Sequence, residues 1–128
     1  KFALVTSATT PSVTDSDPRW GAGGAQDYST NEVSGGDYTA GGKSLTAPAS
    51  ALSGAVTTLS ATSPVSWAAN AASPTNARWG IFYDSTDAGK HVFGYLDLGG
   101  DTSLVNGLNI YFNSTTGAAQ PIFTGTAI

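Results

Sequence analysis

The chain contains no cysteine and no methionine, and it has a single histidine, His91. Without cysteine the protein has no disulfide, no thiol nucleophile, no iron–sulfur cluster and no cysteine-bound zinc, and one histidine cannot form a histidine cluster around a metal. We therefore expect no cofactor and no metal site. Most catalytic repertoires are excluded, and we do not expect an enzyme.

Charge is also scarce. Charged residues make up 11% of the 128 residues, whereas an average domain carries about 25%. Five Lys and Arg against nine Asp and Glu give a net charge of −4 and an isoelectric point near 4.4, which is unsuited to tracking a phosphate backbone. Apolar runs long enough to span a membrane, about 18 residues, are missing. We expect a soluble protein whose partners are neither nucleic acid nor membrane.

The clearest pattern lies in the C-terminal half. Trp79, Ile81 and Tyr83 alternate along 78–83, so their side chains share one face of a strand. Turn-forming residues fill 84–90, and an extended, aromatic-rich run follows over 91–98. These segments predict a β-hairpin.

Two further strands are predicted downstream. Asn106-Gly107 is a strong turn signal, and apolar residues alternate over 108–112. A small-residue loop over 114–120 precedes a short strand over 121–124, which Pro121 marks as a strand start or an edge. We predict about four antiparallel strands in meander order across 77–128.

The N-terminal half is richer in turn residues. A first strand is predicted over 2–6, and a long loop over about 9–37. Short strands are predicted over 44–46 and 56–59, and Pro64–Trp67 ends near a core aromatic. No segment shows a convincing helical stripe, although 49–59 is long enough for one or two helical turns. We predict a single all-β domain over 1–128, an antiparallel β-sandwich or a small β-barrel with long Gly/Ala/Ser-rich loops.

A loop of this length in a small domain usually serves as a binding surface. It holds Trp20 and Tyr28, which we expect to be exposed, and Arg19 beside them. We take Arg19, Trp20 and Tyr28 as the candidate residues for contact with a partner.

Other candidate sites have structural explanations. Acidic pairs at 15 and 17, 84 and 87, and 97 and 101 have spacings that a calcium loop uses, but Asp in such loops usually bonds its own backbone. A catalytic pair of carboxylates needs two acids converging in a cleft and has weak support, because the only glutamate, Glu32, lies in the Gly-rich loop region; His91 is expected at a strand edge. The run 38–44 lacks the first glycine of a phosphate loop, because Asp37 stands in its place.

Two further patterns remain. Asn113-Ser114-Thr115 matches the N-glycosylation pattern, but nothing else in the sequence indicates a eukaryotic secretory protein. Tryptophan and tyrosine side chains can form a platform for sugar rings, and Trp20 and Tyr28 are the candidates for one. A carbohydrate-binding or adhesin module is therefore the main alternative function.

Three strings carry a resemblance to a known family. They are NEVSGGDYTAGGKSL (31–45), ARWGIFYDST (77–86) and GYLDLGGD (94–101), and both ends of the chain are similar as well. In their order and spacing they resemble a family of small structural proteins of tailed bacteriophages. The sequence departs from that pattern in a Gly/Ala insertion over 19–26 and an Ala/Ser-rich stretch over 47–72.

The resemblance implies a virion component, made in the bacterial cytoplasm and located on the outside of the capsid. It implies a decoration or cement protein whose partner is the major capsid protein; a tail structural protein is the alternative within the family. Copies placed around a local symmetry axis would form a homo-oligomer such as a trimer. A charge-poor surface suits this role, because little is lost by desolvation on docking. We also expect the 9–37 loop to contact a neighbouring chain.

Overall fold

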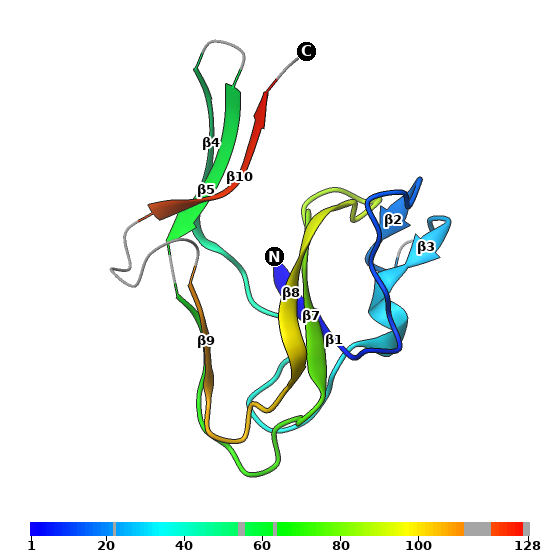
Figure 1. The fold of residues 1–128 in the computed structure, drawn as a ribbon, viewed down its shortest axis with the longest axis vertical. Coiled ribbons are helices and arrows are strands. Elements are labelled where there is room, and N and C mark those ends of the chain that lie inside the picture. Colours follow the sequence, from blue (N-terminus) through cyan, green and yellow to red (C-terminus); the bar gives the residue numbers. More distant parts are fainter. Residues whose placement is uncertain (22, 54–55, 63, 112–118, 127–128) are drawn as a thin grey trace. The chain divides into compact units, whose positions relative to one another are not determined.

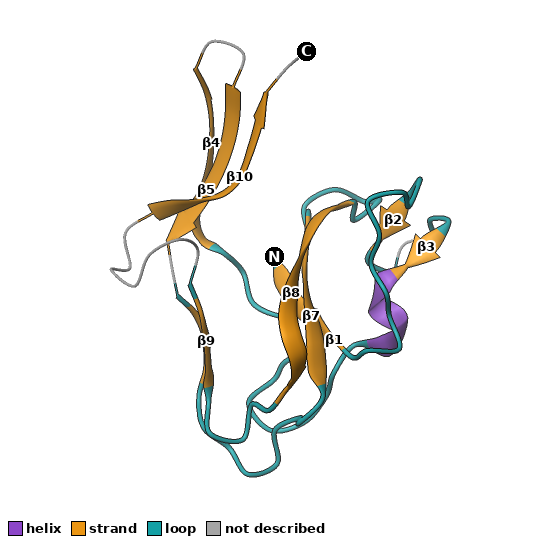
Figure 2. Cartoon of the chain, in the orientation of Figure 1, coloured by secondary structure: helices purple, strands orange, loops and turns teal. Residues whose placement is uncertain are grey.

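The structure, a computed structural model, describes residues 1–21, 23–53, 56–62, 64–111 and 119–126. These residues form strands and one short 3-10 helix, which confirms the predicted all-β class (Figure 2). The strands form two three-stranded and two two-stranded sheets, all open rather than closed into a barrel. In chain order the elements are β1 (Phe2–Val5), β2 (Pro18–Arg19), β3 (Gln26–Asp27), η1 (Tyr28–Asn31), β4 (Thr46–Ser53), β5 (Val56–Thr62), β6 (Val65–Trp67), β7 (Ala77–Tyr83), β8 (Val92–Thr102), β9 (Leu108–Ile110) and β10 (Ala119–Thr126).

The chain groups into two compact units. Unit 1 comprises Lys1–Ser44 and Trp67–Leu108, and unit 2 comprises Leu45–Ser66 and Asn109–Ile128. The grouping rests on contacts within each unit, and two such units can still unfold as one cooperative body. A single domain therefore stays a prediction.

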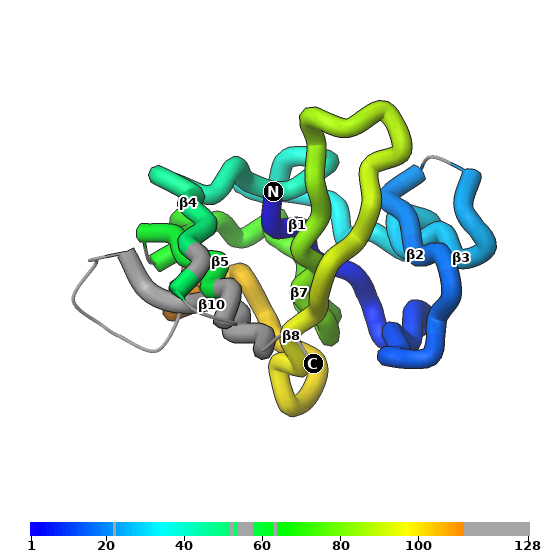
Figure 3. Tube along the Cα trace, turned by 90° about the horizontal axis from the view of Figure 1, so that it is seen from above, coloured from blue at the N-terminus to red at the C-terminus, as the bar shows by residue number. Residues whose placement is uncertain are grey.

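Unit 1 is built on an antiparallel sheet in the order β1-β7-β8, whose strands run side by side in Figures 1 and 3. β7 and β8 pair from Ala77↔Thr102 to Tyr83↔Val92, which confirms the predicted hairpin. β1 pairs with the other side of β7, and all four of its side chains are fully buried. Successive side chains of a strand point to opposite faces, so both faces of this sheet are covered.

One face of this sheet carries a hydrophobic cluster. Ala3, Val5, Ile81 and Tyr83 supply it from the strands, and Trp79 packs against it while partly buried. The predicted shared face of Trp79, Ile81 and Tyr83 is therefore confirmed.

Aromatic rings cover the opposite face. The ring centroids of Phe2 and Phe82 are 4.6 Å apart, and Trp67 lies 6.2 Å from Phe2 and 6.0 Å from Tyr38. Trp67 is only 2% exposed, so the predicted core position at the end of 64–67 is confirmed. Gly80 lets the Phe2 ring lie against β7, because a Cβ there would stand 2.1 Å from Phe2 Cζ.

The segment 9–37 holds only short elements. β2 and β3 form a two-residue parallel pair, and η1 begins where the Asp27 carboxylate accepts a hydrogen bond from Ser29 N (2.9 Å). With four residues, η1 does not approach the length needed to cross a bilayer, and the described residues contain no other helix. Trp20, Tyr28 and Val33 are buried, so hydrophobic side chains attach this mostly irregular segment to unit 1.

Unit 2 contains an antiparallel sheet in the order β10-β5-β4. The strand predicted at 56–59 is confirmed as part of β5, and the described residues of 49–59 belong to β4 and β5 rather than to a helical turn, because the β-branched run at 56–58 favours extended backbone. Pro121 lies in the edge strand β10, beside a register irregularity, as predicted.

The predicted four-stranded meander is wrong beyond its first hairpin. β9 pairs with β6 rather than with β8, and β10 pairs with β5. Alternation of apolar residues indicates that a segment is a strand, but it does not select the partner strand. The predicted loop over 114–120 is wrong at 119–120, which begin β10, and its residues 114–118 lie outside the described residues, as do Phe112 and the Asn113 glycosylation pattern.

Candidate interaction surface

Trp20 belongs to the core of unit 1. It is 5% exposed, and its ring stacks on that of Tyr83 with centroids 5.0 Å apart and planes inclined by 11°. Its backbone N–H donates to Lys90 O (3.0 Å), which fixes the chain beside the β7–β8 turn. The expectation that Trp20 is exposed is wrong, because a glycine-rich backbone does not prevent its large side chains from turning inward.

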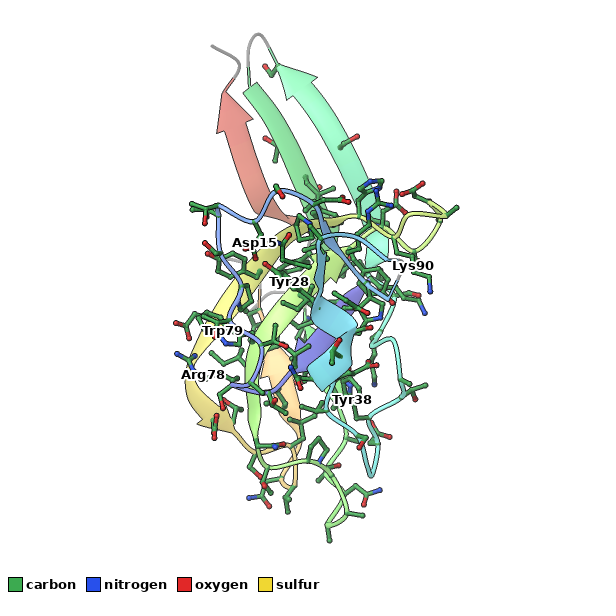
Figure 4. The ribbon with its side chains drawn as sticks, turned by 90° about the vertical axis from the view of Figure 1, so that its right-hand side faces the viewer. Asp15, Tyr28, Tyr38, Arg78, Trp79 and Lys90 are labelled. Carbon is green, nitrogen blue, oxygen red and sulfur yellow. The ribbon has the colours of Figure 1, made fainter. Side chains whose placement is uncertain are left out.

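Tyr28 is buried as well, at 4% exposure, so its expected exposure is also wrong. Its hydroxyl donates to the Asp15 carboxylate, and Ser12 N donates to both the hydroxyl and Asp15 Oδ2 (3.2 Å each). Figure 4 shows Asp15 and Tyr28 close together on neighbouring segments. Burial, and next the Asp15 carboxylate, raise the pKa of Tyr28 to about 12. The tip of the 12–15 turn is held in this way, and Val13 projects from it with 89% exposure.

Arg19 is engaged within its own unit. Its Nε donates to Asp17 Oδ1 (2.8 Å) and its Nη1 to Gly89 O (3.3 Å). The hydrogen bond from Arg19 lowers the pKa of Asp17. These bonds join β2 to the β7–β8 turn, so Arg19 has a structural role whatever else it contacts.

The acidic residues singled out as calcium candidates act on their own loops. The Asp84 carboxylate accepts from Thr86 N (2.8 Å) and Thr86 Oγ1 (2.6 Å), and these bonds lower the pKa of Asp84. Asp97 accepts from Gly99 N (2.6 Å) and pairs with Arg78, which lowers the pKa of Asp97. The expected backbone-bonding role is confirmed for these two residues. Across the described part of the chain, no three His, Asp or Glu residues gather closely enough to hold a metal ion.

His91 lies directly before β8, as expected of a strand-edge residue, and its Nδ1 bonds the Asp87 carboxylate. Both side chains are more than 40% exposed, and Asp87 belongs to the same turn. The bond lowers the pKa of Asp87. The pair supports the turn that Arg19 and Trp20 contact.

Glu32 and the glycines at 41 and 42 form one structural network. Glu32 Oε1 accepts from the Tyr38 hydroxyl (2.8 Å) and from Gly41 N (2.6 Å). Lys43 N donates to Phe2 O (2.9 Å), and Phe2 N donates to Lys43 O (2.8 Å). The backbone N–H groups that a phosphate loop would aim at a ligand are therefore used within the fold at positions 41 and 43.

The tryptophans do not offer open stacking faces. Trp20 and Trp67 are buried, and Trp79 is half-buried with the Arg78 guanidinium 4.4 Å from its ring centre. Figure 4 shows Arg78 and Trp79 together at β7. The sugar-binding platform expected from Trp20 and Tyr28 is absent, because both rings are in the core.

The surface that the sequence reasoning missed is in unit 2. Every Asp, Glu, Lys, Arg and His of the chain lies in unit 1, and unit 2 has no side chain that is charged at neutral pH. Along β4, each residue whose exposure the structure describes is exposed, on both faces of the strand. Among the described side chains of unit 2, only Ala61, Val65 and Ile110 are buried. The signal was present in the sequence, because no ionisable residue occurs between Lys43 and Arg78.

Unit 2 therefore presents a neutral sheet with little core among its described residues, and a soluble three-stranded sheet normally needs an apolar face that something covers. Such a surface can bind another protein through shape and hydrogen bonds, with no charge to desolvate. Comparison with known proteins adds no relative: no family model, no curated protein and no solved structure matches this chain.

Proposed function

We propose that this protein is a structural component of a tailed-bacteriophage virion: a decoration protein that binds the outside of the capsid, with the major capsid protein as its partner. The observation that carries the proposal is the uncharged sheet of unit 2 with its exposed strand β4, which has the properties of a surface that another protein covers. The sequence resemblance supplies the virion setting.

The chemistry of the described residues supports binding rather than turnover. The carboxylates at 84 and 97 and the lone imidazole are tied to neighbouring groups of their own loops or strands. Glu32 is bonded by a tyrosine hydroxyl and a backbone N–H within the fold. A unit 1 that carries all the charged side chains and a unit 2 that carries none suit a binding role in an inert building block.

Neutrality has an energetic consequence for docking. Burying an unpaired ionised group costs several kcal/mol, and even a buried ion pair often gains nothing net. A surface without ionisable groups avoids this cost wherever it docks. On a shell of repeated subunits, many weak contacts of this kind add to a stable coat.

The segment 9–37 offers a second contact. Val13 is 89% exposed and sits on a turn that the Asp15–Tyr28 hydrogen bond holds in place. Val13 is therefore the residue through which we expect this segment to contact a neighbouring chain.

The test is binding to purified heads that lack their decoration protein. Co-sedimentation should show saturable, stoichiometric binding, and the decorated heads should resist heating better than bare ones. Thr46→Lys places a charge on the exposed start of β4, and Thr39→Lys makes the same change at an exposed position of unit 1. We expect Thr46→Lys to weaken binding at least about tenfold, since an unpaired buried charge costs more than about 1.4 kcal/mol, and Thr39→Lys to bind normally.

Two results would contradict the proposal. The first is the absence of saturable binding to heads by the folded wild-type protein. The second is equal binding by both lysine variants, which would remove unit 2 as the contact surface. Binding to glycans in place of heads would favour the adhesin alternative.

A further inference from the structure

The two three-stranded sheets have four outer edges, and these edges differ in how well they are protected. The outer edge of β1 is bonded to the 31–43 segment, where Val33 N donates to Leu4 O (3.1 Å) and Lys43 pairs with Phe2. The outer edge of β8 carries Asp97 and Asp101 and is interrupted by Gly99, which has a φ of +82°. Charges and irregularities of this kind prevent a strand edge from pairing with another chain.

In unit 2 the edges differ. β10 contains Pro121, which has no N–H to donate, and its register shifts between Pro121 and Phe123. β4 begins irregularly, with Ala47 at a φ of +46° and a register shift between Thr46 and Ala49. From Ala49 to Ser53, however, β4 pairs regularly with β5 and has no charge, no proline and no described strand on its outer side. The segment Ala49–Ser53 is thus the longer regularly paired stretch without charge or proline at the edges of this sheet, because the corresponding stretch of β10, Phe123–Thr126, is one residue shorter.

We propose that a second copy of this chain pairs with this edge. Two copies related by a two-fold axis place β4 antiparallel to its own equivalent, which continues the antiparallel order of the sheet. With the axis at the middle of the segment, Ala51 lies opposite Ala51 of the second copy, and Ala49 lies opposite Ser53. Both unit 2 sheets then join into one six-stranded sheet.

Charge selects the second copy as the occupant. The net charge of −4 is carried entirely by unit 1, so two copies that approach through unit 1 repel each other. Unit 2 is the part through which copies can meet without like charges opposite one another. An edge strand free of charge also matches a partner strand that is itself free of charge, and this chain supplies one.

The geometry favours a pair over a ring. A trimer joined edge to edge would need β4 of one copy to bond β10 of the next, and the β10 edge is interrupted at Pro121. The trimer expected from the sequence is therefore an outcome that the experiment separates from the proposed dimer. The inference goes beyond the proposed function, because it needs no capsid.

The experiment measures self-association of the free, full-length protein. Sedimentation equilibrium over about 1 to 1,000 µM spans the affinities of small interfaces, and we expect a monomer–dimer equilibrium. Ala51→Lys places two like charges opposite each other and should weaken the dimer roughly tenfold or more. Ala88→Lys makes the same change at an exposed position in the β7–β8 turn and should leave the dimer unchanged. Circular dichroism shows whether both variants keep the wild-type fold.

Cysteine substitution tests the register. Because the chain contains no cysteine, Ala51→Cys introduces a unique thiol. Residues opposite each other in antiparallel strands have Cα atoms about 4.5 to 5.5 Å apart, which is within the range that a disulfide requires. Mild oxidation should therefore link Ala51→Cys into covalent dimers much faster than Ala88→Cys.

Three results would overturn the inference: a monomer or a trimer across the whole concentration range, a dimer that survives Ala51→Lys, or crosslinking of Ala51→Cys no faster than of Ala88→Cys. Head binding is measured separately. A protein that binds heads as a monomer would refute the dimer and leave the proposed function standing.

Discussion

Truncation of Trp20 distinguishes a core residue from a contact residue. The ring is 5% exposed, stacks on Tyr83 and belongs to the main cluster of unit 1. Replacing a buried tryptophan by alanine loses its transfer free energy and leaves a cavity, which together cost about 3 to 5 kcal/mol. An exposed side chain changes the free energy of unfolding by no more than about 0.5 kcal/mol. A core location for Trp20 therefore predicts a loss of unfolding free energy about tenfold larger than an exposed location does.

The assay is urea unfolding followed by circular dichroism, with thermal melting beside it. Trp20→Ala should lose about 3 to 5 kcal/mol, and its melting temperature should fall by roughly 10 °C or more. Since a domain of this size has only about 5 to 15 kcal/mol of stability, Trp20→Phe is the companion variant, and its ring against Tyr83 should recover roughly half of the loss. Tyr111→Ala, at a residue 43% exposed, is the control. Equal stabilities for Trp20→Ala and Tyr111→Ala would refute the core assignment.

Three further predictions follow from the structure of unit 1. Gly42→Ala should lower the free energy of unfolding by more than about 2 kcal/mol, because Gly42 has a φ of +65° and an added Cβ would stand 2.2 Å from Phe2 O. Gly23→Ala is the control, since Gly23 has a φ of +74° but open space around it, and it should lose only about 1 kcal/mol in the same urea titration. Tyr38→Phe should lose about 1 to 3 kcal/mol, because the hydroxyl accepts from Leu4 N (2.9 Å) and donates to Glu32, and an unchanged unfolding midpoint would contradict this role. Tyr28 should ionise with a pKa of about 12 by ultraviolet absorbance; since its folded pKa lies above the unfolded value of 10, its contribution to stability is complete below pH 10 and is lost as the pH rises toward 12. Asp15→Asn should lower that pKa without restoring the ordinary value, because burial is the larger cause.

Local signals in the sequence predicted local structure well. The β7–β8 hairpin follows from alternation and a turn within one short stretch, and the shared face of Trp79, Ile81 and Tyr83 follows from the two-residue period of a strand. Pairings between distant segments, such as β1 with β7 and β5 with β10, carry no such local signal. For that reason the predicted meander order was wrong, although the described segments assigned to its strands are extended.

The candidate site shows the same limit. Glycine and proline in 9–37 correctly indicated an irregular backbone, but they do not tell where Trp20 and Tyr28 point, and stacking on Tyr83 decides that for Trp20. The uncharged stretch between Lys43 and Arg78 was visible in the sequence. Its meaning required the structure, which shows that the distant C-terminal strand β10, equally free of charge, belongs to the same sheet.

The pairing of β1 with β7 also bears on how the chain reaches its native state. Phe2 is opposite Phe82, so the central sheet cannot form until segments about eighty residues apart have met. Closing so long a loop costs conformational entropy before any contact stabilises it, and proteins dominated by distant strand pairs fold in milliseconds to seconds. During synthesis the apolar β1 leaves the ribosome well before β7, and the interval until β7 follows is the period when this protein most needs protection from aggregation.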